Sequence, residues 1–178
     1  VARAGAPSAA RIGLLMLSLA ANDHSQVDAE VESLPKSYPA DSAVWMAVGD
    51  IQRARGNRND AIAAYRKAAE IAPKDAAPVI GEATLELWDD RLPEAKVLID
   101  RAEKLAPLKP SLEFARALLA YKEKRQQDCA MALQRLLAVV PTYGPGLMLA
   151  GVLNYSTEQF ELARNSFGAY LASDPGNV

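Results

Sequence analysis

Five prolines recur in this chain at a fixed interval of 34 residues, at Pro39, Pro73, Pro107, Pro141 and Pro175. A constant period of this length is typical of stacked repeats, in which each repeat is one supersecondary unit that cannot bury its apolar face alone. The interval predicts a single array over residues 1–178. Its five repeats are expected at 8–41, 42–75, 76–109, 110–143 and 144–177.

The composition favours helices in these repeats. Half of the residues are apolar, but only 6% are aromatic, and alanine is abundant. Such a chain suits closely packed helices better than a sheet of β-branched residues. The formal net charge of -2 argues against a nucleic-acid partner, because phosphate binding requires a basic face. We therefore expect an all-α protein that does not bind nucleic acid.

Each repeat has room for two helices that cross where both carry small side chains. Gly49, Ala83, Ala117 and Gly151 recur in the first helix, and Ala61, Ala95, Cys129 and Ala163 recur in the second. A larger residue follows each second-helix small residue by four positions, on the same helical face. Proline then ends the second helix. The residues predicted to set the packing are Trp45, Gly49, Ala61, Tyr65, Ala68, Pro73, Ala95, Pro107, Cys129, Pro141, Gly151, Ala163 and Pro175.

The repeat at 42–75 carries Trp45, Gly49, Gly56, Ala61, Tyr65, Ala68 and Pro73 at fixed offsets. In this pattern the chain resembles the tetratricopeptide repeat family. The resemblance implies an α-solenoid of about five antiparallel helix pairs that form a right-handed superhelix. It also implies that the first helices line a concave face that binds proteins or peptides.

The two ends of the array depart from the pattern. Leu15 and Val27 replace the small residues of repeat 8–41, so this repeat is degenerate and its two helices are expected to lie further apart. The apolar run from Ile12 to Ala20 is predicted to be an array helix, too short to span a membrane. No polar capping helix follows Pro175. We therefore expect a fragment of a longer array, with self-association through the uncapped C-terminal end as a possible outcome.

Catalytic and metal-binding patterns are missing from the sequence. The chain has one histidine, His24, which we expect in a solvated turn, and one cysteine, Cys129. Cys129 occupies a position where three other repeats have alanine, which predicts a small buried packing residue rather than a reactive thiol. We predict that the chain is no enzyme and that it holds no cofactor and no metal ion. Trp45 is interpreted as a buried stability residue.

The groove positions that the resemblance assigns to the first helices are apolar and aromatic here. Lysine, asparagine and arginine are nearly absent from them, so we predict against a clamp for acidic C-terminal tails. A hydrophobic or aromatic segment, or a helix laid in the groove, is the expected ligand. The alternative is that these side chains pack only against neighbouring helices. The predicted groove residues are Ile80, Thr84, Leu87, Trp88, Phe114, Leu118, Tyr121, Lys122, Met148, Val152 and Tyr155.

The expected function is a non-catalytic scaffold for protein binding, and the partner is not identified. Residues 141–155, with 160–164 and 170–177, resemble the tetratricopeptide lipoproteins of bacterial exopolysaccharide export and the PEP-CTERM sorting system. That resemblance implies a scaffold in the periplasm or cell envelope, with the cytoplasm as the alternative. A regulatory or accessory domain of a larger enzyme or signalling protein is the alternative function.

Overall fold

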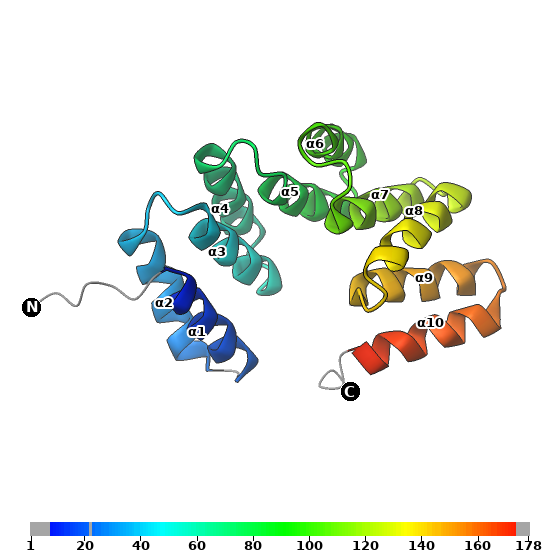
Figure 1. Ribbon diagram of the computed structural model, residues 1–178, viewed down its shortest axis with the longest axis horizontal. Coiled ribbons are helices and arrows are strands. Elements are labelled where there is room, and N and C mark those ends of the chain that lie inside the picture. Colours follow the sequence, from blue (N-terminus) through cyan, green and yellow to red (C-terminus); the bar gives the residue numbers. More distant parts are fainter. Residues whose placement is uncertain (1–7, 22, 174–178) are drawn as a thin grey trace, which may run out of the picture. The chain divides into compact units, whose positions relative to one another are not determined.

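The computed structural model describes residues 8–21 and 23–173, and over these residues the chain forms ten α-helices and no strand (Figure 1). Two consecutive helices fall in each 34-residue repeat, as the proline interval predicts. The helices are α1 (Ser8–Ala20), α2 (His24–Ser37), α3 (Ser42–Ala54), α4 (Arg58–Ile71), α5 (Ala77–Trp88), α6 (Leu92–Leu105), α7 (Pro110–Lys122), α8 (Gln126–Val139), α9 (Gly144–Ser156) and α10 (Phe160–Ser173).

The chain divides into two compact bodies within α5. The N-terminal body ends at Leu85 and the C-terminal body begins at Glu86. In the N-terminal body α1 packs against α2 and α3 against α4, and in the C-terminal body α7 packs against α8 and α9 against α10. Each of these pairs is one predicted repeat. The all-α repeat fold expected from the sequence is confirmed.

The first helix of four repeats ends in the same left-handed turn. Gly56, Asp90, Lys124 and Glu158, spaced by 34 residues, have φ angles of 76°, 58°, 61° and 60°. In each case the next N–H donates to a carbonyl five residues back, as Asn57 donates to Gln52 at 2.8 Å. This is the Schellman arrangement, which glycine adopts at the lowest cost. Only one of the four residues is glycine.

The proline of each repeat follows the end of the second helix. Helices α4, α6 and α8 end at Ile71, Leu105 and Val139, two residues before their prolines. The missing N–H and the ring of proline prevent continuation of a helix. Pro175 lies outside the described residues.

The core of the second repeat is built around the ring of Tyr65, which is 1% exposed. A Cβ on Gly49 of α3 would lie 2.6 Å from this ring, and one on Gly81 of α5 would lie 2.9 Å from it. The ring is therefore held between two glycines of successive first helices. The Tyr65 hydroxyl donates to Asp50 Oδ1 at 2.8 Å, and burial and this carboxylate raise the Tyr65 pKa above its usual range.

Repeat 8–41 buries the two residues that replace its small ones. Leu15 and Val27 are fully buried in a cluster with Leu34, Val44 and Ile51. Helix α1 packs against α2 less extensively than α3 packs against α4, in line with the larger side chains. Helix α2 begins at His24, so this exposed histidine lies in a helix rather than in the expected turn.

Trp45 departs from its expected place in the core. Its side chain is half-buried, and its indole N–H donates to the Pro39 carbonyl at 2.9 Å. One side of the ring is left uncovered by the helix pair of repeat 8–41. This side lines a hollow that Val31 and Pro35 of α2 also line. Trp45 is therefore only partly a core residue.

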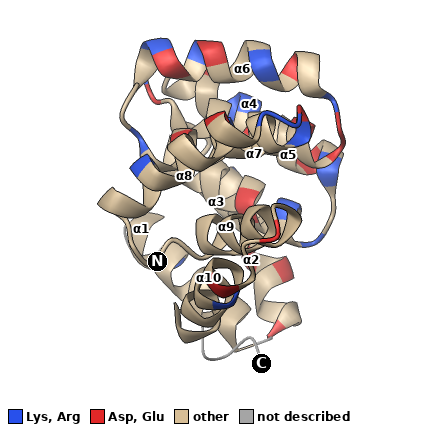
Figure 2. Ribbon diagram, turned by 90° about the vertical axis from the view of Figure 1, so that its right-hand side faces the viewer, with Lys and Arg blue, Asp and Glu red and all other residues tan. Residues whose placement is uncertain are grey.

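The C-terminal body follows the small-to-large pattern of the sequence. Cys129 is fully buried, which raises the pKa of its thiol to about 11. A Cβ on Gly151 would lie 2.4 Å from the ring of Phe167, so this pair repeats the contact of Gly49 with Tyr65. Ala95 and Ala163 are also buried. Acidic and basic residues alternate along α6, the second helix of repeat 76–109 (Figure 2).

Candidate partner-binding groove

The C-terminal body contains a hollow of about 840 Å³ that is lined mainly by the first helices α7 and α9. These helices present residues three or four apart, which lie on one helical face. The end of α5 and the last turn of α10 complete the lining. The lining residues are Trp88, Phe114, Leu118, Tyr121, Lys122, Thr142, Gly144, Pro145, Met148, Leu149, Val152, Tyr170 and Ser173. We call this hollow the groove.

The groove has a buried floor and an exposed apolar rim. Phe114 and Leu118 are 6% and 4% exposed, and the Phe114 ring lies 5.6 Å from the ring of Tyr143. Trp88 and Met148 are 56% and 44% exposed. Exposed large apolar side chains around a concave surface are typical of ligand and partner sites. The floor is therefore held by packing, while the rim is open to contact.

Among the described residues, Lys122 is the one charged residue that lines the groove. Its ammonium group forms an ion pair with Asp90, which lies in the turn after α5. The lysine side chain is 19% exposed, so the pair is partly shielded from solvent. A cation that already has a carboxylate partner offers little to a second one. The described lining of the groove is consequently close to neutral.

Seven of the eleven predicted groove residues line the groove: Trp88, Phe114, Leu118, Tyr121, Lys122, Met148 and Val152. The other four lie elsewhere. Ile80 and Leu87 are 4% and 0% exposed, so they are core residues of α5. The hydroxyl of Thr84 donates to the Ile80 carbonyl at 2.8 Å. Tyr155 is exposed, and its ring contacts Phe160 edge to face at 5.7 Å.

Six lining residues were not predicted from the sequence, and two of them come from a second helix. Tyr170 and Ser173 of α10 reach the groove beside Gly144, at the first turn of α9. The sequence contains a signal for this arrangement. Tyr170 stands where Ala68 and Ala102 stand in two other repeats, and only a long side chain extends from that position to the groove.

A second hollow, of about 690 Å³, lies in the N-terminal body between α2, α3 and α4. Trp45 lines it, together with apolar residues such as Val31 and Val48. Acidic and basic side chains both surround it, and Arg55 pairs with Asp28 across it at 2.7 Å. The rim of this second hollow carries charges of both signs, as ordinary solvated surface does, whereas the described rim of the groove is nearly neutral.

Neither a metal site nor a membrane span is found among the described residues. No group of three or more His, Cys, Asp or Glu side chains in residues 8–21 and 23–173 is placed to hold an ion. None of the helices in this part of the chain has both the length and the hydropathy to cross a bilayer.

Comparison with known proteins identifies the fold. Residues 42–75 match the tetratricopeptide repeat family, and no curated protein matches the chain. A chain of the Cut9–Hcn1 hetero-tetramer of the APC/C has a TM-score of 0.84 and 14% identity over 96% of this chain, which spans only 34% of that protein. A tetratricopeptide repeat protein of Thermus thermophilus has a TM-score of 0.81 and 16% identity, with 96% of this chain and 93% of that chain covered.

The type IV pilus biogenesis factor PilW has a TM-score of 0.74 and 20% identity, with 96% of this chain and 79% of that chain covered. Identities this low establish the fold and leave the partner open. The chain therefore has the fold of tetratricopeptide repeat proteins, an architecture that serves as a scaffold for protein–protein interactions.

Proposed function

We propose that the chain is a non-catalytic scaffold whose groove binds a hydrophobic or aromatic-rich segment of a partner protein, laid down as a helix. The observation that carries this proposal is the combination of an apolar concave lining with exposed Trp88 and Met148. Tryptophan and tyrosine contribute most to binding where they line a pocket that excludes water. An amphipathic helix satisfies its own backbone and presents only apolar side chains to such a surface.

The charge of the groove distinguishes this ligand from an acidic C-terminal tail. Binding of a terminal carboxylate requires unpaired cationic or amide side chains. In the part of the chain that the structure describes, the groove has one cation, Lys122, which is already paired with Asp90. A tail that displaced Asp90 would exchange one ion pair for another, with little net gain. We therefore expect selection for apolar area rather than for negative charge.

The fluorescence of Trp88 tests the proposal directly. The chain has two tryptophans, so Trp45→Phe leaves Trp88 as the single indole. We would titrate this variant with a synthetic amphipathic helix that has a Leu/Phe face, with a scrambled peptide of the same composition, and with an acidic C-terminal peptide. A blue shift with the amphipathic helix alone is expected, because the indole would leave water.

Variants of the rim separate binding from folding. Met148→Glu places a charge on the exposed rim and is expected to weaken peptide binding at least tenfold. Leu108→Ala alters a side chain that is 89% exposed and does not line the groove, so it serves as the matched control. Equal affinity of the two variants for the amphipathic peptide, with unchanged circular dichroism, would contradict the proposal.

The cellular setting that we propose is an assembly of the bacterial envelope. It is supported by the resemblance of residues 141–155, 160–164 and 170–177 to exopolysaccharide-system lipoproteins. The alternative is a regulatory domain of a larger enzyme. Fractionation of cells that produce the intact protein distinguishes the two, since the first requires it in the envelope fraction. Recovery of a covalently linked catalytic domain in the cytoplasm would favour the second.

A further inference from the structure

The hollow of the N-terminal body, which we call the furrow, lies away from the ends of the chain. Its lining residues fall between Asp28 and Lys67, on α2, α3 and α4. Described helices precede and follow this stretch in the sequence, α1 on one side and α5 on the other. The exposure of the furrow therefore does not arise from the place where the chain begins.

The C-terminal body contains the equivalent hollow, of about 370 Å³, which is lined mainly by α6, α7 and α8. Ten of its twelve lining residues lie 68 positions, or two repeats, after a residue that lines the furrow. Arg116 of α7 is one of them. Its guanidinium pairs with Glu103 at 2.7 Å and with Glu113. It also donates to the Pro107 carbonyl at 3.4 Å. In this repeat, an arginine of the chain itself occupies the hollow.

The furrow has no such arginine at its base. Val48 stands 68 positions before Arg116, and Trp45 stands 68 positions before Glu113. Pro35 takes the place of Glu103 in the same way. The base of the furrow is therefore apolar and aromatic, and the furrow is the larger of the two hollows, at about 690 Å³.

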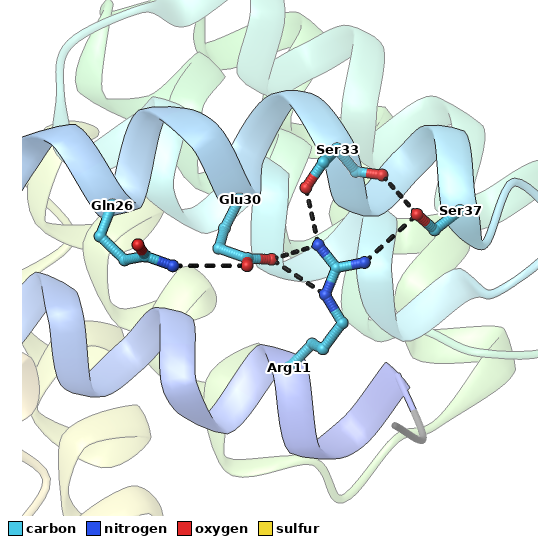
Figure 3. A network of polar contacts seen from close by, with 5 residues as sticks. All are labelled: Arg11, Gln26, Glu30, Ser33 and Ser37. Carbon is cyan, nitrogen blue, oxygen red and sulfur yellow. Dashed lines mark hydrogen bonds and ion pairs between the residues drawn. The ribbon is translucent and has the colours of Figure 1, made fainter. Parts of the chain in front are cut away.

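A second arginine of the chain shows how it holds a guanidinium beside an aromatic ring. Arg11 stands one repeat before Trp45, and its guanidinium lies against α2 (Figure 3). It donates to Glu30 Oε2 at 2.6 Å and to Ser33 Oγ at 2.7 Å. Its central carbon lies 5.9 Å from the centre of the Tyr38 ring. An arginine is thus held by a carboxylate, an oxygen acceptor and an aromatic face.

The furrow offers an aromatic face and a backbone acceptor. Pro35 lies inside α2 and has no N–H, so the Val31 carbonyl, four residues earlier, lacks its usual helical donor. Val31 and Pro35 both line the furrow, which places this carbonyl on the furrow side of α2. The Trp45 ring is fixed, because its indole N–H donates to the Pro39 carbonyl at 2.9 Å.

The charges around the furrow favour a cationic ligand. All three of its cationic side chains already have carboxylate partners: Arg55 with Asp28 at 2.7 Å, Lys36 with Glu32 at 2.6 Å, and Lys67 with Glu70 at 3.0 Å. The carboxylate of Asp60 lines the furrow too, and it forms no ion pair with any described residue. The furrow therefore presents a spare negative charge and a spare acceptor.

From these observations we propose that the furrow binds an arginine side chain of a partner protein. The guanidinium stacks on Trp45 and donates to the Val31 carbonyl, and Asp60 supplies the opposite charge. Arginine suits this place better than lysine, because its planar group stacks on a ring and donates in the ring plane at the same time. This site lies in the N-terminal body, and its occupation does not depend on the groove.

NMR titration of the complete chain with a blocked pentapeptide, Gly-Gly-Arg-Gly-Gly, tests the proposal. The indole N–H signal of Trp45 should shift, with a dissociation constant in the millimolar range expected for one side chain. The indole signal of Trp88, in the groove, should stay in place and serves as the internal reference. The same peptide with lysine should bind about fivefold more weakly, and the peptide with citrulline, which is neutral, should not bind.

Two variants test the acceptors. Pro35→Val restores the N–H with a side chain of similar size, so the Val31 carbonyl regains its helical bond and peptide binding should weaken. The same change should raise the thermal midpoint, because a proline inside a helix is destabilising, so unfolding would not explain the loss. Asp60→Asn should weaken binding about two- to threefold. Glu161→Gln removes an equal charge from α10, at a site that is 76% exposed, and should have no effect.

Three results would overturn the proposal. The first is an unchanged Trp45 signal at saturating arginine peptide. The second is equal affinity for the lysine and arginine peptides, which would indicate attraction by charge alone. The third is a Pro35→Val variant that binds the arginine peptide as tightly as the unmodified chain.

Discussion

The contact of Gly49 with Tyr65 allows a stability prediction from distances. In Gly49→Ala the new methyl would lie 2.6 Å from two ring carbons of Tyr65. The ring has no room to withdraw, because Gly81 faces its other side and Asp50 holds its hydroxyl. Overpacking costs about 1–3 kcal/mol, and a contact this short against a ring that is held on its other side belongs to the upper half of that range, about 2–3 kcal/mol. The better helix propensity of alanine returns about 1 kcal/mol. We expect the variant to be less stable by about 1–2 kcal/mol.

Urea denaturation followed by Trp45 fluorescence, in a Trp88→Phe background, reports on the N-terminal body. The midpoint should fall with an unchanged slope. Gly168→Ala is the matched control, since no atom lies within 4 Å of a Cβ at this site in the middle of α10. It should raise stability by about 0.5–1 kcal/mol, measured by circular dichroism.

A second substitution should rescue the first. Ala117 and Leu133 occupy the equivalent positions of a later repeat, where both are buried. Tyr65→Leu should therefore recover part of the stability lost in Gly49→Ala, as a favourable coupling energy in a double-mutant cycle. The reasoning is refuted if Gly49→Ala is as stable as the unmodified chain, or if the two substitutions are simply additive.

Three further predictions concern the C-terminal body. Lys124 has a φ of 61°, so Lys124→Gly should raise the thermal midpoint, with a gain of about 1 kcal/mol. The raised pKa of Cys129 should keep its thiol unreactive toward iodoacetamide at neutral pH in the folded protein. The contribution of the neutral thiol to folding stability is present below the ordinary thiol pKa, about 8.5. It is lost as the pH rises from there to the folded-state pKa of about 11. Glu113 is 8% exposed and accepts from Arg116 and from Arg135 at 2.9 Å, so Glu113→Ala should cost about 1–3 kcal/mol in urea denaturation.

The register of the fold could be read from the sequence because its signals are local. Pro39, Pro73, Pro107 and Pro141 each follow the end of a second helix, and a small residue every 34 positions marks the crossing in four of the five repeats. The resemblance to tetratricopeptide repeats, applied in this register, implied the groove faces of α7 and α9, and Phe114, Tyr121 and Met148 of the predicted set lie around one hollow.

The burial of individual side chains was not predicted from the sequence, because it depends on packing between helices of different repeats. Repeat positions alone do not show how far a neighbouring repeat covers a side chain. Leu87 is consequently buried although it occupies a groove position, and Trp45 is partly uncovered although it occupies a core position. The reach of Tyr170 into the groove required the placement of α10, since the sequence showed only that an alanine had been replaced.

The left-handed turns bear on the order in which the repeats fold. Asp90, Lys124 and Glu158 must enter a backbone region that disfavours side chains before their helix pairs can close, whereas Gly56 enters it freely. Nucleation in a repeat array begins at the repeat with the lowest local cost and spreads to its neighbours. Among the four repeats whose left-handed turns are described, we expect residues 42–75 to gain amide protection first in pulse-labelled hydrogen exchange. A single glycine would then set the direction of assembly for the chain.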